Sequence, residues 1–350
     1  MKSKKNELIL ERKIILGIES SCDDTSAAVF INNKKLSNVI ASQKVHQEFG
    51  GVVPELASRA HQQNIVPVVH QALKEANVSL HDLNAIAYTK GPGLLGSLLV
   101  GSSFAKSMAY ALNIPLVEVN HMQAHILAHF IEDEAQKAPN FPFLGITISG
   151  GHTQIVKVTD YFTMEVIGET LDDAIGEAYD KCGKMLGLDY PAGPQIDRLA
   201  QLGDATKFSF SKPKVEGLNF SFSGLKTAVL YFLQREHQKN PKFIDQNLND
   251  ICASFQFTVV QILMSKILKA VQQTGIKNVA IGGGVSANSA IREALLNADK
   301  KGQLNAFIPK FEYCTDNAGM IAVVGYFSLL NHKVSNFDAS AKARLHLNEL

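Results

Sequence analysis

The sequence predicts an α/β protein with two similar lobes and a cleft between them. Three observations support this prediction. The chain has 350 residues, which is long for a single hydrophobic core. Apolar, β-branched runs alternate with helical patterns, and one strand–turn–strand pattern occurs twice. With Lys+Arg 34 against Asp+Glu 33, bulk charge does not indicate a nucleic-acid partner, so the function must be sought in local motifs.

The first half of the chain alternates between strand and helix patterns. Strands are expected at 14–19, 27–31, 85–89 and just before residue 120. Helices are expected at 52–76, where Pro67 should break the helix, and at 98–112, after a glycine-rich loop at 91–97. The polar segment 132–142, with two prolines, is the expected hinge between the lobes.

The second half continues the alternation. The expected strands are 144–149, 154–158, 278–281 and 306–309. The expected helices are 171–186, 222–236, 248–273, 291–298 and 317–330, and 190–194 is expected to be a rigid loop. We therefore divide the chain into a disordered leader (1–13), a first lobe (14–135), a second lobe (142–330) and a C-terminal tail (331–350) that covers the surface.

The cysteine content and the hydropathy of the chain indicate the cellular compartment in which the protein is expected to work. The four cysteines, Cys22, Cys182, Cys252 and Cys314, are scattered and form no Cys-x-x-Cys pair. This pattern predicts neither a disulfide framework nor a zinc ribbon, and it suits a reducing cytoplasm. No apolar run is expected to span a bilayer.

The internal repeat narrows the choice of fold. Leu16-Gly17-Ile18-x-x-Ser21-x-x-x-Thr25 matches Leu144-Gly145-Ile146-x-x-Ser149-x-x-x-Thr153 at five positions with a constant offset. Each copy stands at the start of a lobe as a strand, a small polar turn and a second strand. Actin and the sugar kinases hold phosphates with one such turn from each lobe. The repeat therefore predicts an actin-like, sugar-kinase-like fold with duplicated, ribonuclease H-like lobes.

Two glycine-rich turns are candidates for ligand binding. In 149–153, adjacent glycines let backbone N–H groups point at an anion, and Ser149 and Thr153 add hydroxyl donors. A tight hairpin turn is the structural alternative. In 282–288, three glycines between a strand and a helix would let a flat ligand lie on the backbone, although the spacing of a dinucleotide fingerprint is absent.

A histidine pair is the candidate for metal binding. His121 and His125 are four residues apart, so both imidazoles project from one helical face. On spacing alone, a pair of hydrogen-bonded structural histidines is the commoner explanation. Asp316 precedes the last apolar helix, where it could be an N-cap or a third ligand of a metal with open positions. Because residue 122 is Met, the carboxylate of a His-Glu-x-x-His protease is missing.

Acidic residues near these motifs have two interpretations each. Asp23 and Asp24 lie in the first turn, as turn formers or as carboxylates beside a phosphate site. Four more are expected on one helix, where they would form a solvated face or bind hydroxyl groups: Asp172, Asp173, Glu177 and Asp180.

The ordered set of motifs resembles the bacterial-type tRNA threonylcarbamoyltransferase family, often called TsaD. The resemblance extends over about 14–330 and rests on ten stretches. They are 17–23, 53–61, 91–97, 120–125, 149–153, 179–181, 190–194, 222–227, 282–288 and 316–317. The family loop often reads Pro-Gly-Gly-Pro where this chain has Ala192, and Gly193 is kept.

The resemblance implies a reaction, a cofactor and partners. One divalent metal, Fe²⁺ first and Zn²⁺ as the alternative, would bind His121, His125 and Asp316. The donor, threonylcarbamoyl-AMP, would be held by Thr147, Ile148, Ser149, Gly150, Gly151, Asp180, Gly193, Asp197 and Asn288. Its threonylcarbamoyl group would pass to the adenosine next to the anticodon of tRNA. The implied partners are a catalytically silent paralogue (TsaB-type) and a small ATPase (TsaE-type), without a membrane. Our own hypothesis is that Asp23 takes the amine proton.

Three other functions remain open from the sequence. An ATP-dependent small-molecule kinase could use the same fold, although we find no motif for a sugar pocket. A metallopeptidase is suggested by the histidine pair alone. A non-enzymatic nucleotide switch would bind adenylates without turnover.

Overall fold

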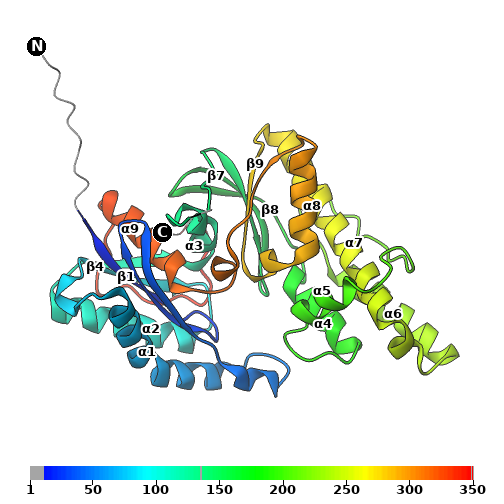
Figure 1. Cartoon of the computed structure of the whole chain (residues 1–350), viewed down its shortest axis with the longest axis horizontal. Coiled ribbons are helices and arrows are strands. Elements are labelled where there is room, and N and C mark those ends of the chain that lie inside the picture. The colour runs from blue at the N-terminus through cyan, green and yellow to red at the C-terminus, as the bar shows by residue number, and fades with distance from the viewer. Residues whose placement is uncertain (1–11, 135, 348, 350) are drawn as a thin grey trace, which may run out of the picture.

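Two five-stranded sheets with the same strand order form the two lobes (Figure 1). The computed structural model describes residues 12–134, 136–347 and 349; most of the expected leader lies outside these residues. The first sheet has the order β3-β2-β1-β4-β5 and the second the order β10-β9-β6-β7-β8. β1 and β6 take equivalent places, since each pairs antiparallel with the next strand and parallel with a later one. The predicted duplication is therefore present in the topology.

The strands lie close to the predicted positions. The first sheet contains β1 (Ile14–Glu19), β2 (Thr25–Ile31), β3 (Lys34–Ala41), β4 (Ala85–Gly91) and β5 (Leu116–Asn120). The second contains β6 (Phe143–Ile148), β7 (Thr153–Asp160), β8 (Thr163–Glu169), β9 (Asn278–Gly282) and β10 (Asn305–Phe307). Sequence analysis missed β3 and β8. Both are edge strands that mix polar and apolar residues, so neither forms a continuous apolar run.

Helices cover the sheets and fill the second lobe (Figure 1). They are α1 (Pro54–Ala76), α2 (Leu95–Leu112), α3 (His121–Leu127), α4 (Ile175–Met185), α5 (Gly193–Ala200), α6 (Ser223–Lys239), α7 (Phe243–Thr274), α8 (Ser289–Lys300) and α9 (Ala318–Leu330). Two expectations were wrong here. Residues 171–174 precede α4 rather than belong to it, and the second part of the expected loop 190–194 begins α5.

The expected break at Pro67 was also wrong, because α1 continues through it. Pro67 is exposed, so the carbonyl that loses its hydrogen-bond partner is on the side facing water. Ile65, Val68 and Val69 on the opposite side are buried in the core of the first lobe. Packing of this apolar face holds the helix together across the missing hydrogen bond.

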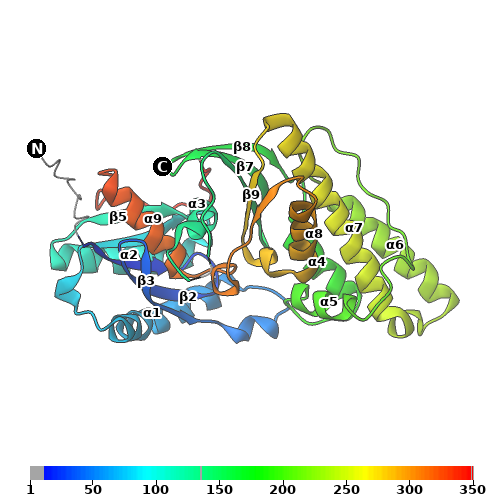
Figure 2. The same ribbon diagram turned by 45° about the horizontal axis from the view of Figure 1, so that its top comes forward.

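The last helix of each lobe packs against the other lobe. α3 follows β5 of the first sheet but contacts β6 and β9 of the second. Helix α9 follows β10, and the sequence division places it in the second lobe, yet it packs on β1, β2 and β4. In both views α3 lies between the two sheets (Figures 1 and 2). The two exchanged helices therefore join the lobes where the cleft forms.

Equivalent glycines of the repeat make this exchange possible. A Cβ atom at Gly17 of β1 would lie 2.5 Å from the carbonyl oxygen of Ala318 in α9. At Gly145 of β6 it would lie 3.1 Å from the side chain of Ile126 in α3. Both glycines allow close approach of a helix to a central strand, which explains why the repeat keeps a glycine there.

α7 is the one described helix that is long and apolar enough to cross a membrane by length and composition, although no such run was expected. Of its most apolar window, 61% is buried inside the protein. The helix packs against α5, α6 and α8 in the second lobe. Its apolar character is thus explained by its position in a protein core.

Candidate functional site

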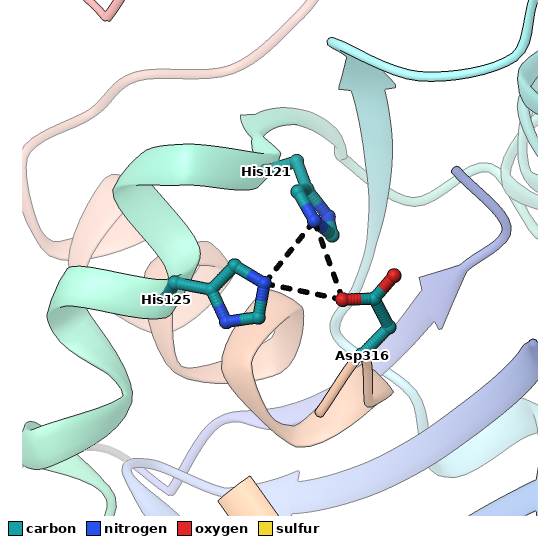
Figure 3. Close-up of side chains that lie close together, drawn as sticks. All are labelled: His121, His125 and Asp316. Carbon is teal, nitrogen blue, oxygen red and sulfur yellow. Dashed lines mark hydrogen bonds and ion pairs between the residues drawn. The ribbon is translucent and has the colours of Figure 1, made fainter. Parts of the chain in front are cut away.

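Three potential metal ligands converge where the exchanged helices meet (Figure 3). The Nε2 atoms of His121 and His125 are 3.2 Å apart, and Oδ1 of Asp316 lies 3.4 Å and 3.1 Å from them. Ligands about 2.0–2.2 Å from one ion in tetrahedral or octahedral geometry lie roughly 3.0–3.5 Å apart. The three residues predicted from sequence therefore have the spacing of a metal site, with positions left open on one side. Among the residues described, no other His, Cys, Asp or Glu triplet has such spacing.

Local structure positions all three side chains. β5 ends at Asn120, whose side chain accepts hydrogen bonds from the N–H groups of Met122 and Gln123 and caps α3. The N-cap of α9 is Asn317. The interpretation of Asp316 as the N-cap was therefore wrong. Because Asn317 caps α9, the carboxylate of Asp316 is available to the histidines.

A buried carboxylate that sequence analysis missed orients His121. Glu19, at the end of β1, is fully buried, and its Oε2 lies 3.0 Å from Nδ1 of His121. Thr89 donates a hydrogen bond to the same oxygen at 2.7 Å. A carboxylate on the second nitrogen of a ligand histidine fixes the ring and leaves Nε2 for the metal. A glutamate in an otherwise apolar, buried strand was the available signal.

We expect Glu19→Gln to weaken Zn²⁺ binding by about tenfold to a hundredfold, because the amide cannot replace the carboxylate beside His121. Competition with a chromophoric chelator would measure the affinity. Glu75→Gln is the matched control, since Glu75 is an exposed residue of α1. Equal affinities of the Glu19 and Glu75 variants would contradict the orienting role.

The charges of the triad stabilise one another. Burial disfavours the charged form of His121, but the carboxylates of Asp316 and Glu19 raise its pKa well above the ordinary value. Burial also disfavours the charged form of Asp316, which by itself would raise its pKa. The nearby His121 and His125 nevertheless hold the pKa of this carboxyl below the usual range. A bound cation would thus replace the proton on His121 and meet an ionised aspartate.

Beside the triad, the second lobe forms a cavity of about 380 Å³. Five of the nine residues predicted to bind the donor line it: Gly150, Asp180, Gly193, Asp197 and Asn288. The four others do not. Thr147 and Ile148 are fully buried at the end of β6, and Ser149 and Gly151 belong to the turn at the cavity edge. The volume lies in the range of small-molecule sites, ~300–1,000 Å³.

Cavity residues are held by a hydrogen-bonded network. Gln256 of α7 donates to Oδ1 of Asp197 at 2.9 Å and accepts from Nδ2 of Asn288 at 2.7 Å. The hydroxyl of Tyr179 donates to the same amide oxygen at 3.2 Å. Asp197 also accepts from the N–H of Ser289 at 3.0 Å. Sequence analysis missed Gln256 because nothing in the sequence distinguishes it from the other polar residues of α7.

Of the acidic cluster expected on one helix, only Asp180 lines the cavity. Burial raises the pKa of Asp180, and the N–H of Ala192 donates to its Oδ1 at 2.9 Å. Asp172 instead accepts from the N–H of Phe222 at the start of α6. Asp173 pairs with Lys181 and Lys226. The latter two aspartates have structural roles.

The residues of the two hairpin turns have different surroundings. A Cβ atom at Gly150 or Gly151 would meet nothing within 4 Å, so this backbone is open to a ligand. In the first-lobe turn, Ser20 donates to the carbonyl of Ser97 and Ser21 lies 3.2 Å from Nδ1 of His121. The hydroxyls expected to hold a phosphate there are therefore engaged inside the protein.

The cavity and the triad lie next to each other. Thr315, which lines the cavity, directly precedes Asp316. The pKa of His152 is lowered to about 4 by burial and by the proximity of His121 and His125. This turn residue of the second lobe is therefore close to the histidine pair.

Asp23 is a partly buried residue of the first-lobe turn. The pKa of Tyr190, a cavity residue, is raised to about 12 by burial and then by Asp180 and Asp23. This electrostatic effect shows that Asp23 lies near Tyr190, although Asp23 is not one of the residues that line the cavity.

Asp24→Asn is expected to make stability less dependent on pH. Burial, followed by the charges of Asp23, Asp316 and Glu19, raises the pKa of Asp24 to about 7, despite a hydrogen bond from Ser42. A raised carboxyl pKa stabilises the fold below the unfolded pKa, near 3.9, and this stabilisation is lost as pH rises through 7. The variant should therefore lose less stability than the parent between pH 5 and pH 8, by roughly 1–3 kcal/mol. Urea unfolding at both pH values measures this, and parallel pH profiles would refute it.

Comparison with known proteins is consistent with this geometry. The family model described as TsaD, tRNA N6-adenosine threonylcarbamoyltransferase, matches residues 34–323. A protein of that name from Christiangramia forsetii is 65% identical over 330 residues, covering 94% of this chain and 97% of the relative. One from Riemerella anatipestifer is 58% identical over 339 residues, covering 97% and 99%.

Solved structures support the fold. Full-length HypF in its phosphate- and nucleotide-bound form matches with a TM-score of 0.60 at 15% identity, over 93% of this chain and 48% of HypF. Component A of (R)-2-hydroxyglutaryl-CoA dehydratase from Acidaminococcus fermentans matches with a TM-score of 0.50 at 15% identity, over 91% and 99%. These likenesses confirm the predicted actin-like, sugar-kinase-like fold. The extended match to the family model and its relatives shows that the chain belongs to the TsaD family of tRNA N6-adenosine threonylcarbamoyltransferases.

Proposed function

We propose that this protein transfers the threonylcarbamoyl group of threonylcarbamoyl-AMP to tRNA and releases AMP. The acceptor is the N6 amine of the adenosine next to the anticodon, in tRNAs that read ANN codons. Family membership supports the reaction and tRNA as substrate. The structural observation that best supports it is that three ligand atoms 3.1–3.4 Å apart lie next to a cavity of about 380 Å³. The two parts would hold the phosphate–carbamoyl portion and the nucleoside of one donor.

In this proposal, the donor lies along the second lobe. The open backbone of Gly150 and Gly151 faces its phosphate, where N–H groups stabilise negative charge as AMP departs. Asp180 and Asp197 accept hydrogen bonds from hydroxyl groups of the ribose. Gly284, which lines the cavity without a side chain, allows the flat base to approach the backbone.

His121, His125 and Asp316 would hold one divalent metal, Fe²⁺ by family resemblance or Zn²⁺ by the same ligand chemistry. Such an ion would supply Lewis-acid polarisation of the donor. Glu19 keeps Nε2 of His121 directed at the site. Asp23 takes the proton that the attacking amine loses as the new C–N bond forms and the bond from the carbonyl to the phosphate oxygen breaks.

The partners follow from the family resemblance and from one surface. Helices α1 and α2 pack together on the outside of the first lobe and expose Val66, Leu95 and Leu99, each at least 49% accessible. A catalytically silent paralogue with a matching helical face would cover these side chains. A small ATPase is the second protein partner, and all three proteins would work in the cytoplasm.

Mass spectrometry of tRNA nucleosides tests the proposal. The tRNA is incubated with this protein, ATP, threonine, bicarbonate and the two companion proteins, and we expect threonylcarbamoyladenosine only when this protein is present. Transfer of radiolabelled γ-phosphate to a small acceptor, with no modified nucleoside, would instead support a kinase.

A further inference from the structure

The C-terminal residues 335–347, here called the C-terminal strap, run along the first lobe towards the metal centre. At its beginning, the N–H of Ser335 donates to the carbonyl of Leu116 at 2.8 Å. The hydroxyl of Ser335 accepts from the N–H of Glu118 at 2.6 Å. Both contacts extend the free edge of β5. Near its end, Leu345 is only 5% exposed and anchors the strap, whereas most of the other strap residues lie at the surface, as expected for the C-terminal tail.

The middle of the strap holds the loop after β4. The N–H of Lys342 donates to the carbonyl of Lys90 at 2.9 Å, and the carbonyl of Ala343 accepts from the N–H of Gly93 at 3.1 Å. At Gly91, a Cβ atom would lie 1.9 Å from the carbonyl oxygen of Lys342. Such close approach needs glycine, and it shows that the loop and the strap are fitted to each other.

The end of the strap contacts the residue that caps α3. Nδ2 of the fully buried Asn120 donates to the carbonyl of His346 at 3.0 Å. The other side of the same amide, Oδ1, accepts from the N–H groups of Met122 and Gln123 at 2.9 and 3.3 Å. The strap carbonyl therefore selects the amide orientation in which the oxygen, not the NH₂ group, faces the beginning of the helix.

This cap matters because α3 is short and carries two of the three ligands. The helix has seven residues, and His121 is its first. Helices of this length are marginal without support from outside, and loss of an N-cap destabilises the first turn. Fraying of the first turn would move His121 away from His125, which lies one turn further on.

We propose that the C-terminal strap is a positioning element of the metal centre, which acts through Asn120 to fix the spacing of His121 and His125. The inference rests on the proposed function, because it takes the triad to be a metal site. The strap residues do not touch the metal; they stabilise the helix turn that presents its ligands.

Zn²⁺ affinity of full-length variants tests the inference. Asn120→Ser keeps a cap oxygen but loses the donor to His346, and a chain that ends at Ala341 lacks His346 altogether. We expect each to bind Zn²⁺ on the order of tenfold more weakly in chelator competition. Their combination should be no weaker than the shortened chain alone, because the shortened chain already lacks the contact between Asn120 and His346. Arg344→Ala is the matched control, since Arg344 is an exposed strap residue, and its affinity should be unchanged.

The outcomes separate this inference from the proposed function. If the intact chain binds no Zn²⁺ or Fe²⁺, the metal centre and the strap inference both fail. If the intact chain binds metal and Asn120→Ser binds it within twofold, with circular dichroism showing both folded, only the strap inference fails. If the shortened chain does not fold, the Zn²⁺ affinity of the Asn120→Ser variant alone tests the strap inference.

Discussion

Replacement of both His121 and His125 by alanine is expected to remove the bound metal and to lower transfer to tRNA by on the order of 10²–10⁴-fold. Two of three ligand atoms are lost, and one aspartate does not hold a transition metal with useful affinity. Metal-assisted stabilisation of a transition state contributes several kcal/mol, which corresponds to this range of rates. Metal content per chain after dialysis and nucleoside analysis of tRNA measure the two effects.

The control for this experiment is a histidine elsewhere on the protein. His70 is exposed on the solvent side of α1, so His70→Ala should keep both metal and activity. Cleavage of a peptide by a preparation of the double variant would point to a contaminating protease rather than to this chain. Normal metal content with normal transfer in the double variant would contradict the proposed metal centre.

Gly176→Ala is expected to weaken binding of a non-hydrolysable threonylcarbamoyl-AMP analogue by about tenfold or more. A Cβ atom there would lie 2.7 Å from the carbonyl oxygen of Ser149 and 2.8 Å from Cα of Gly150. The N–H of Gly176 also donates to Ser149 at 3.1 Å. The methyl group must push the turn away from α4, and forced shifts of this kind cost about 1–3 kcal/mol. Isothermal titration calorimetry measures the affinity.

A glycine outside the site provides the comparison. A Cβ atom at Gly51, which lies just before α1, would also meet nothing within 4 Å, so Gly51→Ala should bind the analogue as the parent does. If the analogue binds equally to Gly176→Ala and to the parent, the turn is not part of the donor site.

Much of the fold could be predicted because local patterns and global structure agree. The repeat around Gly17 and Gly145 predicted duplicated lobes, and its glycines turned out to serve the same contact in both lobes. What sequence could not show was the exchange of α3 and α9 between the lobes. Both helices are buried on most sides, and an apolar helix does not reveal which sheet it covers.

The candidate site was predictable to a similar degree. His121, His125 and Asp316 were found because imidazole and carboxylate are recognisable ligand types, and the structure brings them together. Glu19 was missed because it is a lone polar residue in an apolar strand, and Gln256 was missed because it is one of many polar residues in α7. Their roles depend on partners far away in sequence, 102 residues for Glu19 and His121.

Single-turnover transfer from purified threonylcarbamoyl-AMP to tRNA, without ATP, tests the central claim most directly. The account predicts that the metal-loaded protein forms threonylcarbamoyladenosine and AMP in equal amounts, and that the chelated protein forms neither at a comparable rate. Formation of the modified nucleoside at an unchanged rate after removal of the metal, or no formation from this donor in the presence of the companion proteins, would contradict it.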